Sequence, residues 1–354
     1  MGGAGGNRRS PGNPLGVETI TVARQKFILA GDIGGTKTNV ALYSLQKGRL
    51  RAEAEETFRS KDYSGLEAVL KEFRAEHRQP ILRACFGVAG PVLDGTVKTP
   101  NLPWMIRARQ LAKRLKLKTV ALLNDLEATA YGIFTLKPRE LFTLNAGRGK
   151  RPGNKALIAA GTGLGEAALY HDGREYFPSA SEGGHGDFAP RNEIEIELLR
   201  YLIGKFGHVS YERVLSGPGL WNIYEYLKQS GRLEEPSWLA DKLAAADDRS
   251  AVVTGLALAG ESAICERALE LFVSVYGAEA GNLALRAKAT GGIYLGGGIS
   301  PKIIGKLKQP AFMHAFTDKG RYGEFLSGIP VRVILNEQAA LQGAAYYAAF
   351  RAHD

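Results

Sequence analysis

The sequence predicts an α/β protein with two domains, each built on a mixed sheet, facing each other across a central cleft. At 354 residues the chain exceeds the usual size of a single hydrophobic core. Strand-like and helix-like segments alternate through its first half, as expected for an α/β domain. A strand, a glycine turn and a second strand occur at 29–43 and again at 155–170, which suggests a duplicated domain. Chance similarity between two short hairpins is the alternative to duplication.

The first half carries the elements of one domain. Apolar and β-branched runs predict two strands within 29–43 and further strands at 49–58, 81–89 and 119–123. Apolar residues at helical spacing, such as Leu66, Val69, Leu70 and Phe73, predict a helix over 63–78. Two more helices are expected over 107–115 and 126–134, and Asp94-Gly95 predicts a hairpin turn.

The second half repeats the opening unit and is then mostly helical. Strands are expected at 155–160 and 166–170 around a turn at 161–165, and at 291–295 and 331–335. Helices are expected at 193–206, 219–229 and 338–350, with a long helical stretch over 251–276. The last helix is expected to return to the first domain. The predicted division is a disordered tail at 1–26, a small α/β domain at 27–135 plus 336–354, and a large α/β domain at 136–335.

Composition excludes several classes of protein. The net charge of +10 comes from dispersed Lys and Arg, so we expect no nucleic-acid partner. No apolar run reaches membrane-spanning length, and no apolar segment follows Arg8 and Arg9 as a secretory signal requires. Cys85 and Cys265 lie far apart without metal-type spacing, which predicts reduced thiols in a cytoplasmic protein.

The first glycine turn, from Asp32 to Thr36, predicts a phosphate site. Gly34 and Gly35 let the backbone turn and approach a ligand closely, and Thr36 adds a hydroxyl donor. A carboxylate repels phosphate unless a cation lies between them, so Asp32 indicates a Mg²⁺-nucleotide. Neither the Walker loop nor the dinucleotide fingerprint fits, because Thr36 precedes Lys37 and a strand follows the turn. A plain hairpin turn is the alternative.

Polar side chains elsewhere predict a substrate site. Asn124 and Asp125 follow a strand, where ligands bind in open α/β sheets, although an Asp there can also cap the next helix. Glu182 and His185 stand on a glycine-rich loop and suit vicinal hydroxyls; a solvated loop is the alternative. Zinc is disfavoured, because no Cys or second His lies within ligand spacing. Glu212 is either another hydroxyl acceptor or a helix-start charge. No Gly-x-Ser-x-Gly elbow of a hydrolase is present.

Taken together, these segments resemble the bacterial glucokinase family, within the sugar kinase/Hsp70/actin superfamily. The resemblance runs from about residue 27 to 350 and implies two actin-like (ribonuclease H-like) domains. It rests on six segments in the family's order: 32–36, 123–125, 160–165, 182–185, 212–219 and 296–299. Related sugar kinases and repressors of the ROK type usually carry a cysteine-rich zinc motif after the Glu-x-Gly-His element, and 186–212 contains no Cys.

The resemblance also implies a role for each matching residue. Asp125 would be the catalytic base, and the sugar would be held by Asn101, Asn124, Asp125, Glu182, His185 and Glu212. Asp32 would organise Mg²⁺. ATP would be held by Asp32, Gly34, Gly35, Thr36, Gly161, Thr162, Gly163, Gly296, Gly297 and Gly298. Lys37 departs from the Asn of many relatives, and 227–250 is interpreted as a variable helical insertion.

The function implied is ATP-dependent phosphorylation of D-glucose to D-glucose 6-phosphate, at the entry to glycolysis. A kinase for another hexose or amino sugar, and a sugar-binding regulator without turnover, are the alternatives. ADP or polyphosphate as donor also stays open. A homodimer is expected, since it is common among relatives.

Overall fold

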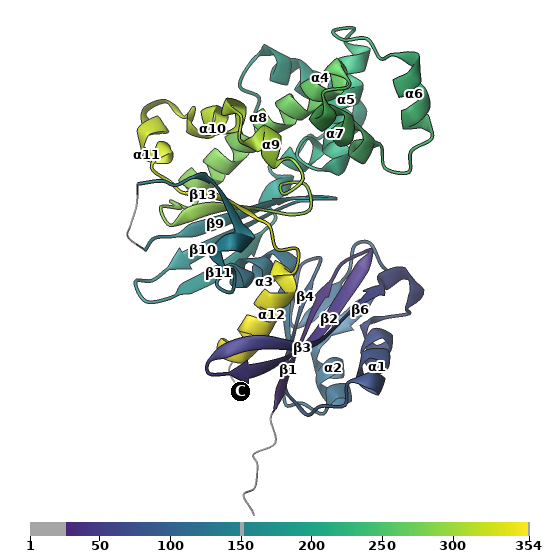
Figure 1. The fold of residues 1–354 in the computed structure, drawn as a ribbon, viewed down its shortest axis with the longest axis vertical. Helices are drawn as coiled ribbons and strands as arrows, with labels where there is room; N and C mark the ends of the chain where they lie inside the picture. Colours follow the sequence, from purple (N-terminus) through teal and green to yellow (C-terminus); the bar gives the residue numbers. More distant parts are fainter. Residues whose placement is uncertain (1–25, 149–151, 353–354) are drawn as a thin grey trace, which may run out of the picture.

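The structure, a computed structural model, describes residues 26–148 and 152–352. The predicted tail therefore lies outside the described residues, apart from Lys26. The chain forms two α/β domains with one mixed sheet each, as the sequence predicts (Figure 1). Within the described part of the chain, no helix combines the length and apolarity needed to cross a membrane.

The first sheet has five strands in the order β3-β2-β1-β4-β7. These are β1 (Phe27–Ile33), β2 (Lys37–Gln46), β3 (Arg49–Arg59), β4 (Ile81–Val88) and β7 (Ala121–Asn124). The first three form an antiparallel meander, and β4 and β7 run parallel to β1. The helices α1 (Leu66–Glu76) and α2 (Ala108–Leu115) confirm two predictions. The Asp94-Gly95 turn is also confirmed, with φ of 49° and 68°, and precedes the short strands β5 (Thr96–Lys98) and β6 (Met105–Arg107).

The second sheet has the order β11-β10-β9-β12-β13-β8. Its strands are β8 (Leu141–Asn145), β9 (Lys155–Ala160), β10 (Leu164–His171), β11 (Tyr176–Ser181), β12 (Gly292–Gly296) and β13 (Val331–Ile334). Antiparallel β9, β10 and β11, followed by parallel β12 and β13, repeat the arrangement of the first sheet. This shared order supports duplication over chance similarity. The strand β10 begins two residues earlier than predicted because Leu164 already pairs with Ala160.

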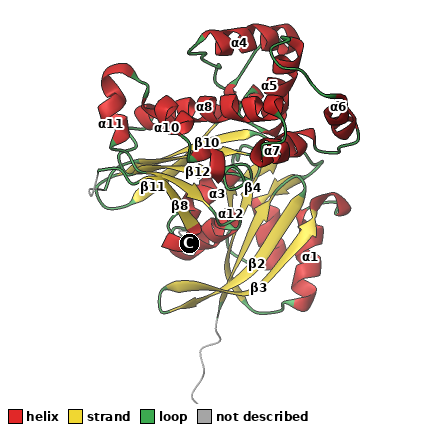
Figure 2. Ribbon diagram, turned by 45° about the horizontal axis from the view of Figure 1, so that its top comes forward, coloured by secondary structure: helices red, strands yellow, loops and turns green. Residues whose placement is uncertain are grey.

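Eight helices described in the second domain gather over the outer face of its sheet (Figure 2). They are α4 (Glu193–Phe206), α5 (Gly217–Gln229), α6 (Ser237–Ala244), α7 (Arg249–Ala259), α8 (Ala263–Arg286), α9 (Ile304–Leu307), α10 (Pro310–Thr317) and α11 (Gly323–Ser327). The prediction of one continuous helical stretch over 251–276 is wrong, because the structure has two helices there. The helix α7 ends at Gly260, which has a left-handed φ of 70°, and α8 then starts anew and continues to Arg286.

Two helices, α3 (Asp125–Gly132) and α12 (Ala339–Phe350), lie between the sheets (Figure 1). The helix α12 packs against β1 and β4, where it buries Ile28 and Cys85. On the side of α3 and α12 that faces the second sheet, Ile133 is buried together with Leu169 of β10. Gly132 and Gly343 let the two helices approach, since a Cβ on either would clash with the other helix's backbone. The domain boundaries drawn from the sequence stay a prediction.

Candidate active site

The first glycine turn connects β1 to β2 and is held by backbone and hydroxyl contacts. The Gly34 amide donates to the Lys37 carbonyl at 2.9 Å. The Ser60 hydroxyl donates to the Gly34 carbonyl at 2.8 Å, and the Ser60 amide donates to the Thr36 carbonyl at 3.0 Å. The turn is therefore fixed before any ligand arrives, which suits a phosphate cradle.

The expectation that the two glycines are needed for the turn is wrong, whereas their close approach to a ligand stays a prediction. Neither Gly34 nor Gly35 has a positive φ, so the turn itself does not require them. Instead, a Cβ on Gly35 would lie 2.8 Å from the Cβ of Asn101. The absent side chain lets Asn101, a predicted sugar contact, lie directly against the phosphate turn.

Asp125 stands at the start of α3, directly after β7. The Leu126 amide donates to the Asn124 Oδ1 at 2.9 Å and to the Asp125 Oδ1 at 3.0 Å, so both residues cap the helix. Asn124 also donates from Nδ2 to the Gly90 carbonyl at 3.2 Å. The capping alternative is thus correct for this pair, and it does not compete with a catalytic role because capping holds the Asp125 carboxylate in place.

The carboxylates of Asp32 and Asp125 lie close enough to influence each other. Burial, followed by the negative charge of Asp125, raises the pKa of Asp32 to about 6, against a hydrogen bond from Asn39 at 3.5 Å. Burial also raises the pKa of Asp125 to about 6, with the Glu182 carboxylate contributing and the Leu126 amide opposing. Asp32 and Asp125 come from the first sheet and α3, whereas Glu182 follows the second sheet. The charges of three predicted site carboxylates, contributed by both domains, therefore influence one another.

The loop with Glu182 and His185 lies flat against β10. Gly184 permits this, because a Cβ there would clash with the Leu164 carbonyl. The Glu182 and His185 side chains are 68% and 59% exposed, with His185 Nε2 4.0 Å from Glu182 Oε2. The backbone of this loop is fixed by packing on β10 while both side chains stay exposed, and their role in binding sugar hydroxyls stays a prediction.

Glu212 is tied to the second glycine turn. The Leu164 amide donates to its Oε2 at 2.9 Å, and a Cβ on Gly163 would lie 2.5 Å from the same oxygen. A predicted sugar contact, Glu212, and a predicted phosphate contact, Gly163, therefore lie side by side. Gly163 contacts Glu212 and does not line the neighbouring cavity.

A cavity of about 870 Å³ opens beside the second glycine turn. From the predicted nucleotide residues it is lined by Gly161, Thr162 and Gly298. Gly296 and Gly297 lie behind it; Gly297 has a φ of 77° and packs on the Ala160 carbonyl. The remaining walls come from α5, from α7 with the three residues before it, and from the segment after β12; the lining residues are Gly217, Pro218, Leu220, Trp221, Ala246, Asp247, Asp248, Arg249, Ser250, Ala251, Thr254, Gly255, Leu258, Ile299 and Lys302.

The residues from 246 to 258 are the part of this site that the sequence interpretation missed. The segment 227–250 was expected to be a variable insertion, yet its end lines the cavity, and the Arg249 guanidinium lies 5.2 Å from the Trp221 ring. An aromatic ring beside a cation suits a purine base. The sequence carries no glycine or charge pattern that would single out these positions.

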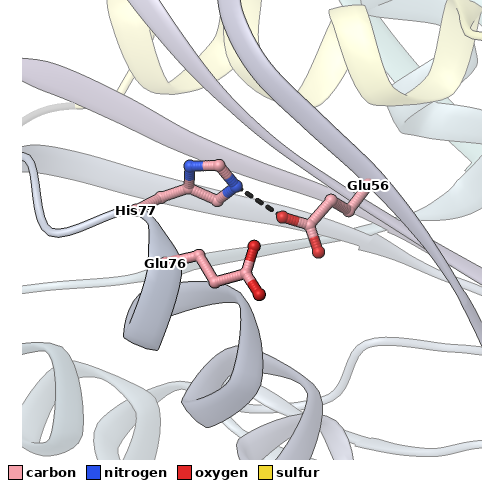
Figure 3. Close-up of side chains that lie close together, drawn as sticks. All are labelled: Glu56, Glu76 and His77. Atoms are coloured by element: carbon pink, nitrogen blue, oxygen red, sulfur yellow. Dashed lines mark hydrogen bonds and ion pairs between the residues drawn. The ribbon is translucent and has the colours of Figure 1, made fainter.

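Among the residues described, Glu56, Glu76 and His77 form the one group of three side chains with metal-ligand spacing (Figure 3). None belongs to the predicted site. His77 makes a hydrogen-bonded ion pair with Glu56, so β3 and the end of α1 are held together by these two residues. This pair accounts for the grouping without a ligand.

Comparison with known proteins identifies the family. The family model described as glucokinase matches residues 29–351. A glucokinase of Nostoc sp. is 41% identical over 338 residues, covering 91% of this chain and 99% of the relative. The solved structure of a glucokinase from an Antarctic psychrotroph gives a TM-score of 0.80 at 29% identity, covering 92% of this chain and 99% of that one.

A more distant structure shares the fold. A ROK family glucokinase from Streptomyces griseus, solved in complex with glucose and AMPPNP, gives a TM-score of 0.60 at 20% identity over 91% of this chain and 99% of that one. The two sheets of like order, the interacting carboxylates and the full-length match lead to one conclusion: this chain belongs to the glucokinase family and has its two-domain, actin-like fold.

Proposed function

We propose that this protein is a glucokinase that transfers the γ-phosphoryl group of ATP to the 6-hydroxyl of D-glucose, at the entry to glycolysis. The observation that carries the proposal is the position of Asp125. Its carboxylate interacts with Asp32, beside the phosphate turn of the first domain, and with Glu182, on the hydroxyl-binding loop of the second. A base between a phosphate cradle and a sugar loop is what hydroxyl phosphorylation requires.

Asp125 would accept the proton of the 6-hydroxyl as the phosphoryl group moves. Burial raises its pKa to about 6, so it is still ionised at neutral pH yet is a stronger base than a free aspartate. Phosphoryl transfer depends mainly on positioning and charge stabilisation. The helix cap on Asp125 supplies that positioning.

The sugar would be held by Asn101, Asn124, Glu182, His185 and Glu212. Glu212 Oε2 already accepts from the Leu164 amide, which orients the carboxylate and leaves Oε1 for a hydroxyl. The Oδ1 of Asn124 already accepts a hydrogen bond from the Leu126 amide. Its second Nδ2 hydrogen is the one that remains for the sugar. A site of this kind rejects a sugar that leaves a buried polar group unpaired.

ATP would lie along the two glycine turns, with its adenosine in the cavity between Trp221 and Gly298. Mg²⁺ would be held at Asp32. The residues fit a divalent cation, because Asp32 is a partly buried carboxylate, with its pKa raised to about 6, that interacts with a second carboxylate, Asp125. When bound, the ion would neutralise charge on the phosphates.

A coupled assay of glucose 6-phosphate formation tests the proposal. We expect turnover with glucose and Mg-ATP to exceed turnover with mannose, fructose and N-acetylglucosamine, and ADP and polyphosphate to fail as donors. Activity on another sugar alone would replace glucose by that sugar. Sugar binding without turnover on any donor would contradict the kinase and favour the regulator.

Compartment and assembly belong to the same proposal. Cys85 and Cys265 are free and buried, which agrees with a reducing compartment such as the cytoplasm. We expect a homodimer, and light scattering on the purified protein measures the mass in solution.

A further inference from the structure

A group of two buried carboxylates and one half-exposed arginine lies beneath the predicted sugar loop and is not part of the site described above. Glu166 on β10 and Glu279 on α8 have side chains that are 2% and 0% exposed. Arg286, at the end of α8, joins them. Its Nη2 donates to Glu166 Oε2 at 3.1 Å and also to the Glu279 carboxylate.

Two neighbouring buried carboxylates favour sharing one proton, because a second negative charge at this position is costly. Two carboxylates face one guanidinium, and Glu166 Oε1 is one of the few buried side-chain oxygens without a hydrogen-bond partner in the described chain. Burial, followed by Glu279, raises the pKa of Glu166 against the effect of Arg286. A proton between the carboxylates satisfies Oε1 and leaves one negative charge opposite Arg286. The other titratable groups that face the pair are Tyr211, Tyr276 and Lys319.

The pair contacts the Glu182 loop directly. A Cβ on Gly183 would clash with Glu166 Oε2, so the loop backbone packs on this carboxylate. The Ser181 hydroxyl donates to the Glu166 carbonyl at 3.2 Å and accepts from the Gly183 amide at 3.3 Å. The loop backbone therefore lies against both the side chain and the backbone carbonyl of Glu166.

Hydrogen bonds also connect the pair of Glu166 and Glu279 to the segment that carries Glu212. Asn282 donates from Nδ2 to Glu279 Oε2 at 2.8 Å and to the Tyr211 hydroxyl oxygen at 3.1 Å. Tyr211 is buried, and its amide donates to the Gly186 carbonyl at 2.9 Å. Glu212 is the next residue, so both segments that carry predicted sugar contacts are supported by this group.

We propose that Glu166, Glu279 and Arg286 form a positioning unit, holding one shared proton, that fixes the 182–185 loop and Tyr211-Glu212 and thereby sets the affinity for the sugar. The inference rests on the proposed function and deepens it. None of the three residues is assigned a contact with substrate.

A definite pH response follows. When the shared proton leaves at alkaline pH, a second negative charge remains buried under the loop, and the glucose KM rises. Glu166→Gln replaces the protonated carboxyl by a neutral amide and removes this response. Glu166→Ala removes the support under the loop at every pH.

The experiment combines glucose KM and kcat between pH 6.5 and 9.5 with hydrogen exchange of the 181–186 amides in the sugar-free protein. For Glu166→Ala we expect the glucose KM to rise about ten-fold, because buried partners lose their hydrogen bonds. The kcat should stay within about three-fold of the wild type, because the loss of binding affects the bound substrate and the transition state equally. The amides of the loop should exchange faster. Glu166→Gln should match the wild type at pH 7 and keep a flat KM at pH 9.

Glu195→Gln is the matched control. Glu195 is also a fully buried carboxylate paired with an arginine, Arg191, at the start of α4. Its substitution should leave the glucose KM and the loop exchange unchanged. If Glu166→Ala does not fold, Gly183→Ala replaces it, since the added methyl group pushes on the same carboxylate and should raise the KM similarly.

An unchanged glucose KM and unchanged loop exchange in Glu166→Ala, or in Gly183→Ala where it replaces that variant, would overturn the positioning role. A Glu166→Gln protein as impaired at pH 7 as Glu166→Ala would overturn the shared proton. A wild type that phosphorylates no sugar contradicts the proposed function instead, and the exchange measurement on the sugar-free protein still decides the positioning role.

Discussion

Asp32 and Asp125 are partly buried, desolvated carboxylates whose charges interact, an arrangement that destabilises a protein at neutral pH. Burial is the main reason that both pKa values rise to about 6, and mutual repulsion adds to the effect at Asp32. The ionised form of each residue therefore lowers the stability of the folded protein. Such conflicts are expected where function, rather than stability, selects a residue.

Asp125→Asn should separate activity from stability. Turnover should fall by about 10²–10⁴-fold, the range for loss of a general base. The free energy of unfolding at pH 7.5 should rise by about 1–3 kcal/mol, because the buried charge is gone while the helix cap remains. Coupled kinetics and urea unfolding measure the two effects.

The exposed Asp94→Asn change is the control, since Asp94 stands in the β-turn before β5. It should alter neither quantity. An Asp125→Asn protein with retained turnover, or with lower stability, would contradict the role of a buried base.

The stability gain of Asp125→Asn should depend on pH in one direction. The folded pKa of about 6 lies above the ordinary 3.8, so the folded state binds the proton more tightly than the unfolded state. The cost of the wild-type carboxylate is therefore fully present above pH 6 and disappears as pH falls to about 4. Unfolding of both proteins at several pH values should show the difference closing in that window.

The pH dependence of activity should reflect the ionisation of Asp32 and Asp125. The kcat/KM for glucose should fall as pH drops through about 6, because a protonated Asp125 accepts no proton. Asp32 titrates in the same range, so the apparent values belong to the pair. A kcat/KM that is flat down to pH 5 would contradict this assignment.

At the scale of elements, the contact between α3 and α12 depends on two glycines. A Cβ on Gly343 would overlap the Ala128 carbonyl, which is backbone and cannot rotate away. Gly343→Ala should therefore destabilise the protein by about 2 kcal/mol or more, as overpacking does. Gly204→Ala in α4 is the control, since a Cβ there meets nothing within 4 Å and helix propensity favours Ala by up to about 1 kcal/mol. Thermal unfolding of both variants compares them; equal melting temperatures would contradict the close packing.

Local patterns made several elements predictable from the sequence. The strands of both glycine turns are apolar and β-branched, and Asp125 was recognisable because it follows a strand. The end of α7 at Gly260 was missed, since one glycine within an apolar stretch does not reveal its left-handed φ. The partnership of Glu166 with Glu279 and Arg286 depends on contacts between β10 and α8, which no local pattern encodes.

At the scale of the whole molecule, the candidate site is divided between the domains. Asp125 lies at the start of α3, whereas Glu182 and Glu212 belong to the second domain. If the proposed site is correct, a sugar that contacts all three should draw the two halves together and exclude water, which would limit ATP hydrolysis. Small-angle scattering should show a smaller radius of gyration with saturating glucose. An unchanged radius in a protein that binds glucose would contradict closure.

The position of α12 has a consequence for the order in which the protein matures. The first sheet is synthesised before the second domain, yet one of its faces, with Ile28 and Cys85, is covered by residues 339–350. Domains that fold during synthesis normally do so from the N-terminus onward. Here the earlier half emerges from the ribosome with an apolar face exposed and must wait for α12 to cover it. Chaperone demand during translation should therefore centre on this face.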